Sequence, residues 1–157
     1  MTPDTRDMSE PKPFTPFRPV DPETFAGHPM PASVPDGLRL ELSRAKLLDG
    51  KEAQLDEWMR MLHDRYEECL VSVAAEHAAF EATFTHTEAD GSHWIYHLSL
   101  IGENGGGLDT SNPVDAEHEA YARRTKQRGW EELTPKFLLA PRHILEALTR
   151  WGRTGRV

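Results

Sequence analysis

The chain has 157 residues, of which 38% are hydrophobic and 28% charged, so its length and composition are those of one ordinary globular domain. Its formal net charge is -8, which argues against a nucleic-acid partner, because affinity for nucleic acid comes largely from basic groups that neutralise phosphates. No apolar run approaches the roughly 18 residues of a membrane helix, so we expect no membrane partner either.

The expected cellular location is the cytoplasm. The N-terminal residues lack the basic patch and apolar stretch of a signal peptide. Cys69 is the single cysteine, so it cannot form an internal disulfide, and this composition fits a reducing compartment.

Proline density divides the chain near residue 37. Nine of the twelve prolines lie in residues 1–37, where each fixes φ and removes a backbone donor. We therefore predict a disordered arm at 1–37, a folded domain at 38–151 and a basic tail at 152–157. Three aromatic residues of the arm leave local docking on a groove open as an alternative: Phe14, Phe17 and Phe25.

Residues 38–43 alternate leucine with polar residues, which predicts a half-buried strand that ends at the turn 48–51. The next segment carries apolar residues at spacings of three and four, which predicts one amphipathic helix. Its stripe is Leu55, Trp58, Met59, Leu62, Tyr66, Cys69, Leu70 and Val73. Because Cys69 belongs to this stripe, we interpret it as a packing residue.

Two alternating segments, 80–85 and 93–100, flank Asp90-Gly91 and predict a β-hairpin. A three-residue loop at 90–92 would align the apolar residues Phe80, Ala82 and Phe84 with Leu100, Leu98 and Trp94/Tyr96. In that register we expect Thr85 opposite His97 and Thr83 opposite Ser99.

The remaining elements follow a glycine-rich loop at 102–107. Asn112 and Pro113 mark the start of a second helix, which we expect to run to about Gly129. A fourth strand is predicted over Leu133–Ala140, and Pro141 opens a last helix. The order βαββαβ plus a helix predicts an α+β, ferredoxin-like layer, in which helices cover one face of a four-stranded antiparallel sheet. The face expected to lie under the helices carries Leu40, Leu42, Phe84, Tyr96 and Leu98.

Four segments resemble a bacterial domain family of unknown function within the dimeric α/β-barrel superfamily. They are RLELSRAKLLDGKEAQLDEW, SHWIYHLSLIGEN, SNPVDAEHEAYAR and WEELTPKFLL, within residues 38 to about 140. The resemblance implies a homodimer of two ferredoxin-like subunits that join through their open sheet faces and enclose a pocket. It implies no settled activity, because the superfamily includes cofactor-free monooxygenases, cyclases, isomerases, haem-handling enzymes and proteins without known chemistry.

The sheet face expected to be free of helices is polar, and it supplies the candidate ligand-binding residues: Arg39, Glu41, Thr83, Thr85, His97 and Ser99. Glu41 and His97 point the same way from neighbouring strands, and a carboxylate beside an imidazole can act as a general base. His97 and Glu41 are therefore the candidate catalytic residues. The alternative interpretation is a hydrated dimer interface without chemistry.

We expect no metal and no cofactor. The predicted register places His86 on the opposite face from His93 and His97, and no cysteine pair or helical His-x-x-x-His is present. His97 has small polar neighbours, which do not suit a haem pocket.

Two functional hypotheses follow. The first is a small-molecule-binding or structural homodimer. The second is a cofactor-free enzyme that acts on a small organic substrate with His97 as base and Glu41 behind it. The sequence leaves open whether the protein is an enzyme.

Overall fold

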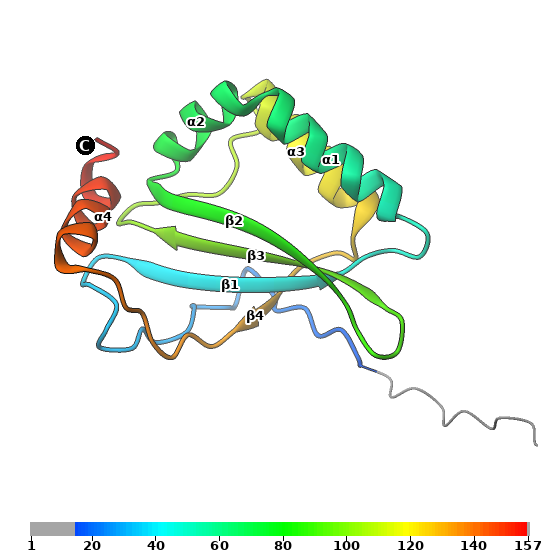
Figure 1. Cartoon of the computed structure of the whole chain (residues 1–157), viewed down its shortest axis with the longest axis horizontal. Coiled ribbons are helices and arrows are strands. Elements are labelled where there is room, and N and C mark those ends of the chain that lie inside the picture. The colour runs from blue at the N-terminus through cyan, green and yellow to red at the C-terminus, as the bar shows by residue number, and fades with distance from the viewer. Residues whose placement is uncertain (1–14, 157) are drawn as a thin grey trace, which may run out of the picture.

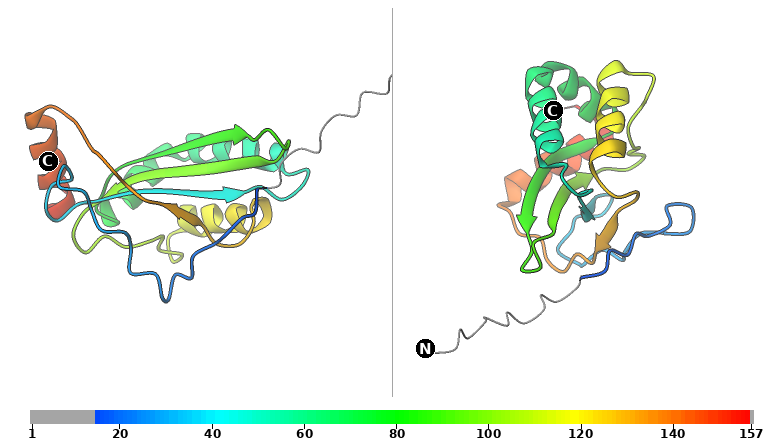
Figure 2. Two further views of the ribbon diagram at one scale, coloured as in Figure 1. Left: turned by 90° about the horizontal axis from the view of Figure 1, so that it is seen from below. Right: turned by 90° about the vertical axis from the view of Figure 1, so that its right-hand side faces the viewer.

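The computed structural model describes residues 15–156 and is an α+β fold with four helices on and beside a four-stranded antiparallel sheet (Figure 1). The sheet order is β2-β3-β1-β4. In chain order the elements are β1 Arg39–Lys46, α1 Glu52–Asp64, α2 Tyr66–Ala75, β2 Ala78–Thr87, β3 His93–Ile101, α3 Pro113–Thr125, β4 Glu131–Leu133 and α4 Arg142–Thr154. Helices α1 and α3 lie side by side over the sheet, and α4 lies at one end of it (Figures 1 and 2). None of the helices within 15–156 has the length and apolar composition needed to cross a bilayer.

The helices cover the opposite sheet face from the one predicted. Ala45 and Ile95 are buried in one cluster with residues of α1 and α3, among them Trp58. Since side chains alternate along a strand, the polar residues that share a face with Ile95 also lie under the helices. The prediction assumed that only the apolar face would be covered, and that the helices would cover it. It was wrong because other parts of the chain cover the apolar face, while the helices cover the opposite one.

The cover of the helix-free face comes from chain segments outside the sheet. Val34, Leu38 and Leu100 form a second buried cluster, and Leu138 from the β4–α4 connection packs against it. These segments run along the sheet on the side away from α1 and α3 (Figure 2). Leu40 of strand β1 packs against this cluster and so has apolar partners on the face without helices.

The arm predicted as disordered packs on the fold over its described part, residues 15–37. Val34 is 5% exposed, and Val20 N donates to Trp130 O at 2.9 Å. The Phe17 ring lies 6.0 Å from the Trp94 ring, centroid to centroid, so the docking alternative holds for this aromatic residue. Phe14 and the rest of residues 1–14 lie outside the described residues.

The hairpin has the predicted apolar pairs: Phe80 with Leu100, Ala82 with Leu98, and Phe84 with Tyr96. The predicted threonine pairs were wrong by two residues, because Thr83 lies opposite His97 and Thr85 opposite Ile95. The loop spans 88–92 rather than 90–92 and is closed by the hydrogen bond from Glu88 N to Ser92 O at 2.8 Å. Because side chains alternate with a period of two, a shift of two residues does not change which side chains of the hairpin share a face.

The predicted first helix is two helices that meet at Arg65. The backbone of Arg65 leaves the helical region, with φ -110° and ψ 30°. Its guanidinium group binds Glu68 through two nitrogens, at 2.9 and 2.6 Å, and also contacts Glu117 of α3. The change of direction leaves Tyr66 58% exposed, although the single-helix interpretation placed it in the apolar stripe.

The C-terminal half follows the sequence signals at its helix starts and departs from them at element ends. Asn112 Oδ1 accepts from Val114 N at 3.2 Å, which confirms the predicted cap. α3 ends at Thr125, before Gly129, because Lys126 is extended and bridges to Leu47. β4 is the short segment Glu131–Leu133 instead of 133–140, and α4 begins directly after Pro141 as predicted.

Candidate functional site

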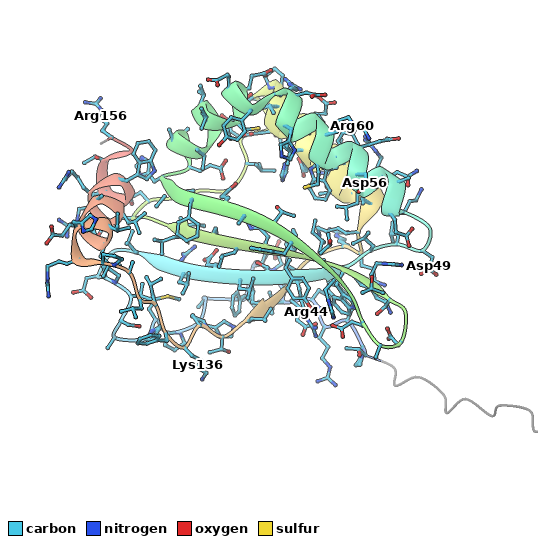
Figure 3. All side chains as sticks on the ribbon, viewed as in Figure 1. Arg44, Asp49, Asp56, Arg60, Lys136 and Arg156 are labelled. Atoms are coloured by element: carbon cyan, nitrogen blue, oxygen red, sulfur yellow. The ribbon has the colours of Figure 1, made fainter. Side chains whose placement is uncertain are left out.

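A cleft of about 550 Å³ lies between α1–α2 and strand β2. One wall is apolar and comes from the two helices: Met59, Leu62, Tyr66, Cys69, Leu70 and Val73. Polar side chains lie among the remaining lining residues: His63, Ser72, Glu76, Glu81, Thr83, Asp115 and His118. Side chains from the helices and the sheet point into the space between the two layers, whereas Asp56 and Arg60 of α1 point away from it (Figure 3).

Glu81 and His97 face the helices from adjacent strands. The distance from His97 Nε2 to Glu81 Oε2 is 3.9 Å, which is an ion-pair distance but too long for a hydrogen bond. The interaction with His97 holds the pKa of Glu81 below its ordinary value, although burial acts in the opposite direction. Glu81 is therefore an ionised carboxylate at neutral pH, with a side chain that is 37% exposed.

His118 of α3 is held by Trp58 of α1. The Trp58 Nε1–H group donates to His118 Nδ1 over 3.4 Å, and the two rings meet edge to face at 76°. An indole nitrogen can only donate, so Nδ1 is the acceptor and the proton of the neutral ring sits on Nε2. Burial lowers the pKa of His118, which keeps the ring neutral and Nε2 a hydrogen-bond donor.

Ser72 joins two carboxyl groups at one end of the cleft. Its Oγ lies 2.7 Å from Asp115 Oδ1 and 2.8 Å from Glu76 Oε1. Asp115 is 4% exposed, and its Oδ2 accepts from Asp109 N at 3.0 Å. A hydroxyl group carries one proton, so it can donate to one carboxylate and must accept from the other contact if both are hydrogen bonds.

Glu76 is the group suited to carry the additional proton. Burial raises its pKa to about 7, and the nearby charges of Glu81 and Asp115 act in the same direction, against the hydrogen bond from Ser72. Near neutral pH a protonated Glu76 can donate to Ser72 Oγ, which then donates to Asp115. The cleft thus contains one carboxylate held ionised and one carboxyl group that exchanges a proton near neutrality.

The predicted catalytic pair is placed differently. Glu41 lies opposite Ser99 in the register and forms an ion pair with Arg39 at 2.7 Å, whereas His97 lies opposite Ser43 and Thr83. Within residues 15–156 no hydrogen bond or ion pair joins Glu41 to His97, and the carboxylate beside His97 is Glu81.

The predicted ligand-binding residues divide between the cleft and its surroundings. Thr83 lines the cleft, and His97 reaches it through Glu81. Ser99 is 1% exposed, so the surrounding protein covers it. Thr85 lies beyond the lining, opposite Ile95, and Arg39 is exposed at the start of β1. Ligand binding by these residues stays a prediction.

Sequence reasoning missed Ser72, Glu76, Asp115 and His118 as members of a site. The sequence pattern pointed to no role for Asp115 or His118, but both share the cleft-facing side of α3. Their spacing of three residues, and the spacing of four between Ser72 and Glu76, places each pair on one helix face. That spacing was available in the sequence, whereas the packing of α2 against α3 was not.

The described residues offer no built metal site, since no group of three or more His, Cys, Asp or Glu side chains within 15–156 could hold an ion. A family model described as a family of unknown function, DUF6176, matches residues 38–146. The chain belongs to this family. The part matched to DUF6176 contains every lining residue of the cleft and ends within α4. No curated protein and no solved structure matches the chain.

Proposed function

We propose that the protein binds a small organic molecule in the cleft between α1–α2 and β2. The observation that carries the proposal is the combination of an apolar helical wall with polar groups that converge from α1, α2, β2 and α3. A volume of about 550 Å³ lies within the range of small-molecule sites, which are mostly apolar and carry a few polar groups that fix orientation.

The polar groups indicate what the ligand must offer. Glu81 accepts hydrogen bonds and carries negative charge, and the Ser72–Glu76–Asp115 group adds further oxygens. A ligand with an amine or hydroxyl group on an apolar body would satisfy these acceptors while its body lies against α1 and α2. The Nε2–H of His118 supplies a donor for an oxygen of the same molecule.

Native mass spectrometry of protein purified under mild conditions tests this proposal. We expect the wild type to carry a bound organic mass, and we expect Glu81→Gln to lose most of it because the charge at the cleft is removed. Glu57→Gln, at an exposed position on α1, is the matched control and should keep the ligand. Equal occupancy in both variants would contradict a role for Glu81.

A second candidate is a cofactor-free enzyme that moves a proton on a small substrate. The observation that favours it is that the pKa of Glu76 is raised to about 7 while the pKa of Glu81 is lowered, both in one cleft. Groups whose environments push their pKa values apart can serve as acid and base. In this account Glu81 with His97 accepts a proton from a carbon next to a carbonyl group, and Glu76 protonates the oxygen. Loss of solvent-deuterium incorporation in Glu76→Gln, with carbonyl compounds as substrates, is the test.

We also propose that the domain is ferredoxin-like and pairs with a second copy through the part of its helix-free face that the covering segments leave exposed. The strand order and the antiparallel pairing support the first part. The second part rests on apolar residues of that face: Leu42 and Leu98 are partly exposed, and Phe84 is 55% exposed. A dimer of this kind differs from the one expected from the sequence, because its contact is apolar instead of polar. The cytoplasm stays our expected location.

Sedimentation equilibrium tests the dimer. We expect the wild type to be dimeric at micromolar concentration and Phe84→Glu to be monomeric, because a charge would then be buried in the contact. Thr85→Glu, on the same strand but the opposite face, is the control and should remain dimeric. A monomeric wild type would refute this proposal and leave the cleft proposal intact.

A further inference from the structure

A second hollow is lined mainly by residues of α4. Figure 1 shows α4 at the end of the molecule away from the β2–β3 hairpin loop. It is an open groove of about 790 Å³, lined by Pro35, Leu139, Ala140, Arg142, Leu145, Glu146, Thr149, Arg150, Arg153 and Thr154. It shares no lining residue with the cleft. The groove therefore belongs to a separate part of the protein.

Three arginines share the groove side of α4. Arg142, Arg150 and Arg153 are exposed, and helical spacing places them on one face. Within the part of the chain that the structure describes, none of the three has an ion-pair partner. Glu146 stands one turn from both Arg142 and Arg150 but lies beyond ion-pair distance of either. In a chain of net charge -8, three unpaired cations on one face are a local reversal of sign.

The groove also has an apolar part. Leu139 is 79% exposed, and Leu145, Ala140 and Pro35 lie beside it. Covering this aliphatic side chain with the apolar body of a ligand would be favourable in water. The groove thus combines an apolar surface with guanidinium groups, which bind carboxylates through paired hydrogen bonds.

The opposite face of α4 fixes the helix in place. Trp151 Nε1 donates to Ala78 O at 2.7 Å, and Leu148 packs in the second buried cluster. Gly152 approaches the backbone of Gly102 so closely that a Cβ on Gly102 would lie 2.0 Å from Gly152 O. Since this face is packed without space, the arginine face is held in one orientation before any ligand arrives.

We propose that the α4 groove binds a small amphiphilic anion, a carboxylate with an alkyl or aromatic body. The arginines hold the carboxylate, and Leu139 and Leu145 cover the body. A groove of about 790 Å³ has room for a single molecule of this kind. This site goes beyond the cleft proposal and stands whether or not the cleft binds a ligand.

Isothermal titration with decanoate below its micellar concentration tests the proposal, with decanol as the neutral comparison. We expect decanoate to bind and decanol to bind at least about tenfold more weakly, since charge-assisted hydrogen bonds are lost. Arg150→Gln and Arg153→Gln should each weaken decanoate binding by roughly tenfold. Glu146→Gln should strengthen it, because the opposing charge in the groove is removed.

Arg128→Gln, an exposed arginine in the α3–β4 connection, is the matched control and should bind decanoate like the wild type. Unchanged thermal unfolding of the variants would show that they are folded. Decanoate affinity that is indifferent to Arg150, Arg153 and Glu146 would overturn the proposal. So would binding to phosphatidylglycerol vesicles without binding to monomeric decanoate, which would identify the groove as a membrane contact.

Discussion

At the scale of single residues, the protonation of Glu76 is the feature with the widest consequences. Ser72 lies within hydrogen-bond distance of two carboxyl groups and can donate to one of them. The pKa of Glu76, raised to about 7 by burial, allows this residue to supply the missing proton. The sequence placed Ser72 and Glu76 on one helix face but could not show which residues of α3 would face them.

We expect the raised pKa of Glu76 to appear in the pH dependence of stability. Between the ordinary value of 4.5 and about 7, the folded state binds more protons at Glu76 than the unfolded state does. The contribution of Glu76 to the free energy of unfolding therefore falls as pH rises through that window. Urea unfolding of the wild type and Glu76→Gln from pH 5 to 9 measures it.

The wild type should lose stability relative to Glu76→Gln as the pH rises, and the difference should level off above about pH 8. Glu57→Gln, exposed on α1, should run parallel to the wild type throughout. A pH-independent difference between the wild type and Glu76→Gln would mean that the pKa of Glu76 is not raised.

At the scale of elements, the sequence predicted the helices and strands better than it predicted how they pack against one another. Alternation of apolar and polar residues predicted the hairpin strands and their apolar pairs, and Asn112 predicted the start of α3. These features could be predicted because their signals are local in the sequence. Alternation could not show which sheet face the helices cover, since that depends on apolar residues distant in sequence such as Val34 and Leu138. The break between α1 and α2 at Arg65 could not be predicted for the same reason, since one partner of Arg65, Glu117, is 52 residues away in the sequence.

Paired alanine substitutions in β3 test the face assignment. Ile95 is 2% exposed under the helices, whereas Leu98 is partly exposed on the other face. We expect Ile95→Ala to lower the free energy of unfolding by about 2–5 kcal/mol, because it opens a cavity in a closed core. Leu98→Ala should have a smaller effect by urea denaturation. A larger effect of Leu98→Ala than of Ile95→Ala would indicate that the helices cover the face predicted from the sequence.

At the scale of the whole molecule, residues 15–37 act as part of the fold. They pass along the side of the sheet that carries no helix and close the buried cluster around Leu38 and Leu100. Proline content predicted the absence of helix and strand there, and the segment indeed contains neither. It did not predict packing, because a few well-placed residues such as Val34 are enough to hold an irregular segment.

Substitution of Val34 tests this view of the arm. Val34 is 5% exposed, and we expect Val34→Ala to reduce the free energy of unfolding by about 1–3 kcal/mol through lost apolar burial. Val71→Ala, at a valine that is 68% exposed on α2, should change it by less than about 0.5 kcal/mol. Equal small effects in chemical denaturation would indicate that the arm contributes nothing to stability.

The central claim is that the cleft between α1–α2 and β2 holds a small molecule, and a tryptophan placed in the cleft tests it most directly. Thr83 lines the cleft, and Thr87 lies on the same face of the same strand outside it. The measurement is the fraction of protein that carries an organic ligand after purification, by native mass spectrometry, for Thr83→Trp and Thr87→Trp. We predict that Thr83→Trp loses the ligand because the indole fills the space, while Thr87→Trp keeps it. Full occupancy in folded Thr83→Trp, or a wild type that carries and accepts no ligand, would contradict the account.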